Sequence, residues 1–81
     1  IEGTGDYKTI LQELLQGEYR KMPEYELIRT AGPDHDKIFE ISVKLNDKII
    51  GNGSGKSKKE AEKNAAKEAL KFVENKIKNK K

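Results

Sequence analysis

Residues 51–70 read GNGSGKSKKEAEKNAAKEAL, and this stretch decides the fold because a glycine-rich segment runs directly into a helix. The spacing of Ser57 and Glu60 matches a capping box, in which each residue bonds a backbone amide near the other, so a helix is predicted from about Lys58. Small or short apolar residues recur every four positions along one stripe of this helix: Ala61, Ala65, Ala69 and Val73. Because these side chains are short, this face of the helix can approach a sheet closely.

The start of this stretch is similar to a nucleotide-binding phosphate loop, but the spacing excludes one. That motif needs a glycine five positions before Gly55, where this chain has Ile50. A dinucleotide-binding pattern fails as well, because its third glycine would fall on Lys56. The physical argument for an anion remains, since the amides at a helix start attract negative charge.

Three lysines stand at this helix start: Lys56, Lys58 and Lys59. They oppose the helix dipole, which costs a few tenths of a kcal/mol or more, so their presence indicates an external anion. The alternative is that solvent and the nearby carboxylates of Glu60 and Glu62 screen them.

The residues before this stretch predict three sequential antiparallel strands. The cleanest alternation lies in the middle strand, with four apolar residues: Phe39, Ile41, Val43 and Leu45. Asn46-Asp47 suits a tight hairpin turn, because both residues tolerate positive φ. Residues 48–52 predict a short third strand, followed by a glycine turn. Residues 24–31 predict the first strand, with Tyr25 and Leu27 alternating with Glu24 and Glu26.

A first helix is predicted from Asp6, which can cap it, to Gly17, which can end it. Its apolar face has the spacing of an amphipathic helix: Tyr7, Ile10, Leu11, Leu14 and Leu15. The expected fold is therefore α+β with the order α-β-β-β-α, both helices covering one face of a three-stranded antiparallel sheet. Residues 1–5 are expected to form a linker stub, residues 6–74 to form the domain, and residues 75–81 to form a frayed lysine-rich tail. The second helix is expected to fray from about residue 74.

Composition bounds the function of this 81-residue chain. It holds no cysteine, so no disulfide or thiolate metal site is expected, and its one histidine cannot build a metal cluster. No apolar run approaches the roughly 18 residues of a membrane span, and no signal peptide is visible, which favours the cytoplasm. Residues 56–81 carry ten lysines and four glutamates, whereas residues 1–55 carry seven basic and ten acidic residues. This asymmetry favours a polyanionic partner, although a solvated lysine-rich helix is the alternative.

The polar side of the first helix carries a second helical stripe: Thr9, Gln12, Glu13 and Gln16. Phosphate binding would favour Lys or Arg at these positions. The stripe consists mainly of uncharged hydrogen-bonding groups plus one carboxylate, which suit hydroxyls and base edges instead. A ribose 2′-hydroxyl both donates and accepts, so Gln and Glu can each pair with it. The alternative is an ordinary solvated helix face.

The loop at residues 32–36 reads GPDHD. Pro33 stiffens it, and the ring of His35 could enter a shallow groove. The alternative is an ordinary turn, because no partner nucleophile or metal site supports a catalytic histidine.

Taken together, three stretches resemble the double-stranded RNA-binding domain: DYKTILQELLQ, PEYELIRTAGPDHDKIFEISV and GNGSGKSKKEAEKNAAKEAL. The resemblance covers Asp6 to about Val73. The third stretch carries the glycine, Ser-Lys-Lys and Ala-Ala pattern of the family. The first, with its Asp-Tyr-Lys-Thr opening, is most similar to the C-terminal domain of bacterial ribonuclease III.

The resemblance implies three regions in contact with double-stranded RNA, which such domains bind by shape more than by sequence. The helix stripe and the Pro33–His35 loop, with Asp34, would meet two successive minor grooves, and lysines would hold the phosphates between them. The implied lysines are Lys56, Lys58, Lys59 and Lys63. Glu62 departs from many family members, which carry Lys there, so the outer edge of the grip is expected to weaken or to shift to Lys63.

The resemblance also implies a parent protein, a ribonuclease III that cleaves double-stranded RNA in RNA processing. That parent is expected to be Mg-dependent and homodimeric, and its catalytic domain is expected to lie upstream and to be absent here. By this inference the 81 residues bind RNA without being an enzyme and need no cofactor or metal. Two alternatives stay open: a general electrostatic binder of nucleic acid or anionic membrane, and a protein-interaction module of the same fold.

Overall fold

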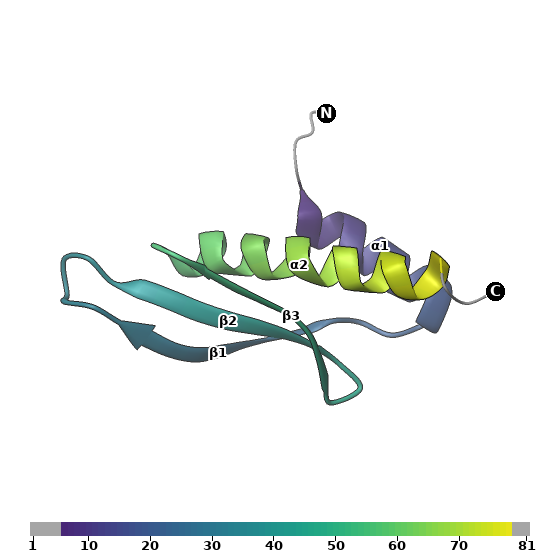
Figure 1. Cartoon of the computed structure of the whole chain (residues 1–81), viewed down its shortest axis with the longest axis horizontal. Coiled ribbons are helices and arrows are strands. Elements are labelled where there is room, and N and C mark those ends of the chain that lie inside the picture. Colours follow the sequence, from purple (N-terminus) through teal and green to yellow (C-terminus); the bar gives the residue numbers. More distant parts are fainter. Residues whose placement is uncertain (1–5, 79–81) are drawn as a thin grey trace.

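The computed structural model describes residues 6–78, so the predicted linker stub and residues 79–81 lie outside the described residues. The elements follow the predicted order: α1 (Tyr7–Tyr19), β1 (Glu24–Ala31), β2 (Ile38–Leu45), β3 (Lys48–Gly55) and α2 (Lys58–Lys78). The three strands form one antiparallel sheet in the order β1-β2-β3. Both helices lie on the same face of this sheet (Figure 1), which confirms the expected fold class.

Tight connections keep the strands sequential. Asn46 and Asp47 join β2 to β3 with φ values of 55° and 68°, which confirms the predicted hairpin turn.

A register shift interrupts the pairing of β1 with β2 between Leu27 and Arg29. Leu27 is 43% exposed although it alternates with glutamates, because β1 is the strand farthest from α2, which packs on β2 and β3.

The core lies between the helices and the sheet. Leu11 and Leu15 of α1 are fully buried, as is the whole predicted alanine stripe of α2. Ile10 was predicted on the core face of α1, but it is 48% exposed. Successive residues turn by about 100° around a helix, so Ile10 lies at the margin of the face that Leu11 centres.

Glycines in β3 let α2 lie almost directly on the sheet. A Cβ atom at Gly53 would stand 2.1 Å from the amide nitrogen of Ala65, and one at Gly51 would stand 2.6 Å from the amide nitrogen of Ala69. The predicted end of the third strand at residue 52 was therefore wrong. The strand continues to Gly55, because these glycines serve close packing and not a turn.

The outer edge of β3 is covered by side chains of α2. The backbone amide of Asn52 donates to the Glu68 carboxylate at 2.6 Å, and the Asn64 side-chain amide donates to the Ser54 carbonyl at 2.7 Å. Backbone groups that an edge strand normally leaves unpaired are thus satisfied within the domain.

Both helices are longer than the sequence predicted. Gly17 lies inside α1, and the helix ends when Arg20 takes the left-handed conformation, its amide bonding to the Gln16 carbonyl. The predicted stop at Gly17 was therefore wrong. The helix α2 continues to Lys78, through most of the segment predicted to fray.

Candidate nucleic-acid interface

The predicted polar stripe of α1 is exposed along its whole length. Asp6 begins the helix by accepting the Thr9 amide at 3.4 Å, and it also accepts the Thr9 hydroxyl at 2.7 Å. The hydroxyl bond, then the amide bond, holds the pKa of Asp6 below its usual value. Because its proton points at Asp6, the Thr9 hydroxyl offers its remaining lone pairs to an outside donor.

Two further members of the stripe present hydrogen-bonding groups to solvent. Gln16 donates its amide to the Met22 sulfur at 3.1 Å, which leaves its side-chain carbonyl oxygen without a hydrogen bond among the described residues. Gln12 makes no hydrogen bond with any residue that the structure describes. The stripe therefore offers acceptors at Thr9 and Gln16 and an unpaired amide between them, a set that fits ribose hydroxyls.

The loop between β1 and β2 is the second predicted region. Gly32 starts the loop with a backbone φ of 93°, which residues with a side chain rarely adopt. The Asp36 amide closes the turn by donating to the Pro33 carbonyl at 2.9 Å. Pro33, Asp34 and His35 are all exposed. Figure 1 shows this loop projecting past the sheet at the end where α2 begins.

The start of α2 is built as the capping box predicts, with one difference. The Glu60 amide donates to the Ser57 hydroxyl at 3.0 Å, but the Glu60 carboxylate accepts the amide of Lys56, one residue before the cap, at 2.8 Å. Glu60 is therefore engaged with the backbone. Its carboxylate orders the turn in which the lysines stand.

The lysines of this helix start point to solvent. Lys58, Lys59 and Lys63 are exposed, and within residues 6–78 none of them forms an ion pair. Lys56 lies 3.8 Å from the Asp36 carboxylate, which joins the helix start to the loop. A hollow of about 220 Å³ lies between loop and helix start, with His35 and Lys56 in its lining.

The three regions follow one another along the molecule. In Figure 1 the loop, the start of α2 and the body of α1 succeed each other along the horizontal axis, which is the longest at 47 Å. The structure thus brings the loop and Lys56 into contact and sets the α1 stripe further along. This order matches the succession of minor groove, phosphates and minor groove that the resemblance implies.

One link between α1 and α2 had no counterpart in the sequence analysis. The Lys8 ammonium lies 2.5 Å from the Glu62 carboxylate and 5.0 Å from the centre of the Tyr25 ring. From the sequence, Glu62 was expected either to screen the nearby lysines or to depart from the family pattern, and neither expectation paired it with Lys8. Lys8 carries no signal of its own, because the pairing exists only once the two helices pack.

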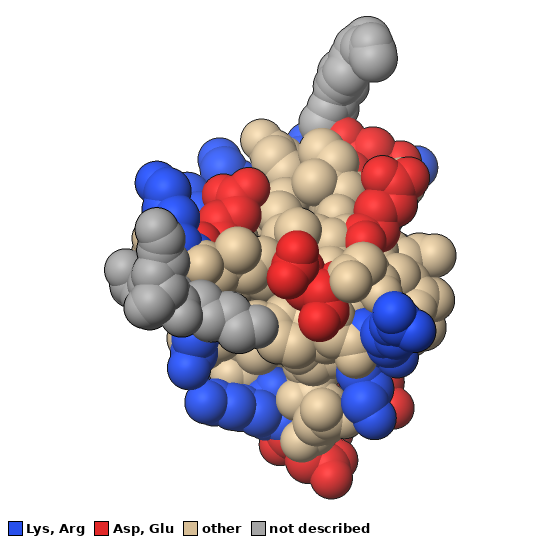
Figure 2. All heavy atoms as spheres, turned by 90° about the vertical axis from the view of Figure 1, so that its right-hand side faces the viewer, with Lys and Arg blue, Asp and Glu red and all other residues tan. Residues whose placement is uncertain are grey.

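Charges are mixed at the opposite end of the molecule. Figure 2 views the end near the last turns of both helices, where Lys, Asp and Glu side chains are interspersed. Near the start of α2, by contrast, the carboxylates of Glu60 and Glu62 are each engaged by a backbone amide or by Lys8. Among the described residues drawn on this face, basic and acidic side chains lie side by side, so this described surface is not continuously basic.

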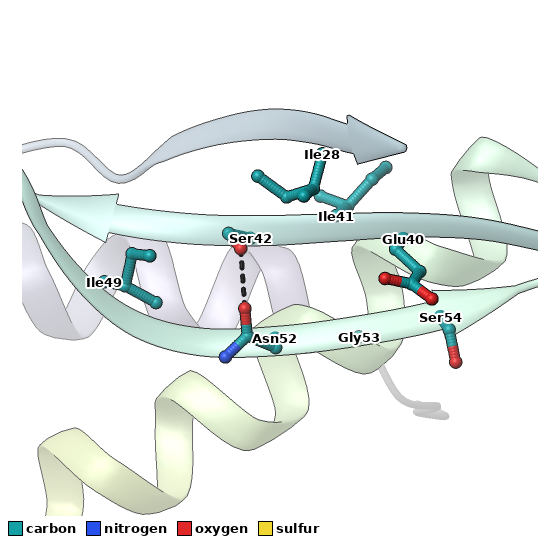
Figure 3. A pocket seen from close by; sticks show the side chains of 8 residues that line it. All are labelled: Ile28, Glu40, Ile41, Ser42, Ile49, Asn52, Gly53 and Ser54. Atoms are coloured by element: carbon teal, nitrogen blue, oxygen red, sulfur yellow. Dashed lines mark hydrogen bonds between the residues drawn. The ribbon is translucent and has the colours of Figure 1, made fainter. Parts of the chain in front are cut away.

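The outer face of the sheet carries a different feature, a groove of about 470 Å³ (Figure 3). Ile28 and Ile49 line it and are 49% and 48% exposed. Between them the buried Ser42 hydroxyl donates to the side-chain oxygen (Oδ1) of Asn52 at 2.6 Å. The groove holds none of the predicted RNA-binding residues, so it forms a second and separate surface.

Tyr25 lies beneath the link between the two helices. Burial, and then the charges of Glu62 and Asp6, raise the pKa of Tyr25 to about 12. Its hydroxyl is buried and has no hydrogen-bond partner among the described residues. An ionised Tyr25 is thus disfavoured in the folded state.

Stability is therefore expected to be insensitive to Tyr25 below pH 10, where the tyrosine is neutral in both states. It should fall as pH rises from about 10 toward 12, because the unfolded chain then releases the proton more readily. Urea midpoints measured at pH 9 and pH 11 should differ less for Tyr25→Phe than for the parent chain. Tyr19→Phe is the matched control, and an equal effect of both variants would contradict this assignment.

No group of three or more His, Cys, Asp or Glu residues in the described part of the chain could hold a metal ion. No helix among residues 6–78 is long and apolar enough to cross a membrane.

The comparisons with known proteins agree with this geometry. A family model described as "Double-stranded RNA binding motif" matches residues 7–73. The chain therefore belongs to the double-stranded RNA-binding motif family, which confirms the resemblance seen in the sequence.

Relatives within the family include two bacterial enzymes named ribonuclease 3. The chain is 56% identical to that of Natranaerobius thermophilus over 76% of its own length, and 51% identical to that of Borreliella burgdorferi over 86%. It spans 27% and 29% of those two proteins. The solution structure of dsRBD2 of DRB4 is also similar, with a TM-score of 0.62 and 38% identity, covering 85% of this chain and 96% of that one.

Proposed function

We propose that this chain binds A-form double-stranded RNA through three successive contacts and largely without regard to sequence. The α1 stripe and the loop carrying His35 would each enter a minor groove, and the lysines at the start of α2 would hold the intervening phosphates. The observation that carries the proposal is the order of these regions along one axis, with the mainly uncharged α1 stripe beyond the lysines. Shape and 2′-hydroxyl contacts are how proteins distinguish duplex RNA from DNA.

The decisive measurement is a titration of this chain with RNA and DNA duplexes of equal length and sequence. A hydrogen bond is worth about 1 kcal/mol, or roughly fivefold in affinity, so the loss of two or more with DNA should give a preference for RNA of about tenfold or more. Equal affinity for both would favour a general electrostatic binder. Binding to neither would favour a protein-interaction module, for which the outer groove with Ile28 and Ile49 offers a surface.

Gln12→Ala tests the stripe itself. The variant is expected to narrow the preference for RNA over DNA by about fivefold, because one side chain that meets hydroxyls is gone. The dependence of affinity on salt should stay nearly intact, since no phosphate contact is lost. Glu18→Ala, on α1 but off the stripe, is the control and should leave the preference as it is. A change in the salt dependence alone would show that Gln12 has another role.

We further infer that these residues are the RNA-binding part of a ribonuclease III, an endoribonuclease of RNA processing. The identity to the ribonuclease 3 relatives supports this inference. In that protein, a Mg-dependent catalytic domain outside these 81 residues would cut the RNA and form the homodimer, in the cytoplasm. The chain alone should then bind labelled duplex RNA in Mg²⁺ and leave its length unchanged, whereas cleavage by the purified chain would refute this division of roles.

A further inference from the structure

The contact between Lys8 and Glu62 lies between two of the regions that would hold RNA. Lys8 precedes Thr9, the first residue of the α1 stripe, and Glu62 precedes Lys63 in the lysine-bearing turns of α2. The two side chains meet at 2.5 Å and remain 44% and 29% exposed. The pair therefore connects the two surfaces directly and is open to substitution without a cost in the core.

Lys8 is held from more than one side. Its ammonium also lies 5.0 Å from the centre of the Tyr25 ring on β1, so one side chain contacts α2 and the sheet together. The other contacts that seat α1 are mainly apolar, through the buried Leu11 and Leu15. Apolar packing sets which face of α1 is buried, and the contact of Lys8 with Glu62 adds a directional tie at the N-terminal turn of the helix.

The partner that Glu62 takes also decides how much charge the lysines present. Glu62 stands four residues after Lys58 and three after Lys59, which are helical neighbours within reach of it. The structure pairs it with Lys8 instead. Among the described residues the carboxylate forms no ion pair with Lys58 or Lys59, which would face phosphate.

We propose that Lys8 and Glu62 are positioning residues, which set the α1 stripe at the spacing from the α2 lysines that lets both engage one RNA duplex. This inference rests on the proposed function, because it concerns how two of the proposed contacts act together. It replaces the expectation that Glu62 weakens the outer edge of the phosphate grip. The carboxylate contributes by ordering α1 and not by contacting RNA.

Glu62→Gln separates positioning from simple electrostatics. If Glu62 only repelled phosphate, its neutralisation would tighten binding to RNA and DNA alike. As a positioning residue, its loss should lower the preference for RNA over DNA by about threefold to fivefold, since the stripe no longer meets its hydroxyls in step with the lysines. Because the pair is exposed, the Tm should change by only a few degrees, and folding is not at risk.

A charge exchange supplies the rescue. Glu62→Lys alone should lower the preference for RNA over DNA, because Lys8 and the new lysine then repel each other. The double variant Lys8→Glu, Glu62→Lys has the net charge of the parent chain and should recover most of that preference. Glu26→Gln is the matched control, as it breaks the ion pair with Lys44 at 2.8 Å on the sheet and should leave the preference unchanged.

The outcomes distinguish this inference from the proposed function. A parent chain that does not prefer RNA would refute the proposed function itself. A parent chain that prefers RNA, with Glu62→Gln binding both duplexes more tightly at an unchanged ratio, would overturn the positioning role alone. Failure of the charge exchange to recover the ratio that Glu62→Lys lost would overturn it as well.

Discussion

Replacing Gly53 by alanine is expected to lower the free energy of unfolding by about 3 kcal/mol or more, a large part of the stability of so small a domain. The added Cβ would stand 2.1 Å from the Ala65 amide nitrogen and 2.6 Å from the Ala61 carbonyl oxygen. Both are backbone atoms and cannot rotate aside. The helix α2 would have to lift from β3 and lose the close packing of its alanine stripe.

Gly17→Ala is the control with the opposite sign. Gly17 lies within α1, and no heavy atom stands within 4 Å of a Cβ placed there. Alanine should therefore raise stability by about 0.5–1 kcal/mol, because it restricts the unfolded chain and favours helix. Urea unfolding followed by circular dichroism measures both variants. A Gly53→Ala midpoint close to that of the parent chain would show that α2 can shift without loss.

Replacing both Lys58 and Lys59 by alanine is expected to give the largest loss of RNA affinity. Each phosphate contact contributes a salt slope of about one unit, which at 0.1 M salt amounts to roughly tenfold in affinity. The double variant should therefore lower the slope by about two units and the affinity by about 30- to 100-fold. Stability should hardly change, because both side chains are exposed and make no ion pair with a described residue.

A second double variant keeps the change in charge and moves it along the helix. Lys71 and Lys78 are also exposed on α2, about three helical turns or more beyond Lys58 and Lys59. Their replacement by alanine should reduce the salt slope far less, if contact with phosphate is confined to the helix start. Equal losses from both double variants would mean that the whole helix attracts RNA by net charge, without a defined phosphate site.

Local patterns in the sequence predicted most of the fold because they depend on neighbours in the chain. The alternation of β2, the Asn46-Asp47 turn and the alanine stripe each follow from period or backbone preference, and all three are confirmed. The glycines of β3 could not be interpreted in this way. A glycine favours a turn and a close helix contact equally well, and only the packed helix decides between them.

The sequence likewise predicted only those features of the candidate site that depend on neighbours in the chain. Which residues share the polar side of α1 follows from helical periodicity, and the structure leaves that side exposed. The contacts that order the site cross between elements, as in the pairs Lys8 with Glu62 and Lys56 with Asp36. Such pairs depend on the angle and distance between packed segments, which periodicity does not contain. The helix end at Arg20 was missed for a related reason, since a left-handed arginine is rare.

The cover that Asn64 and Glu68 place over β3 has a consequence for crowded molecules. A long duplex can hold many copies of a small binding domain side by side, and exposed strand edges at such local concentration promote fusion of sheets and aggregation. Along β3 an incoming strand would have to displace both side chains from the backbone. Along β1 the register shift beside Ile28 interrupts the ladder that a neighbour would extend. Under the proposed RNA binding, copies bound side by side would therefore meet no bare backbone at Asn52 or Ser54 through which β3 could pair with a neighbour.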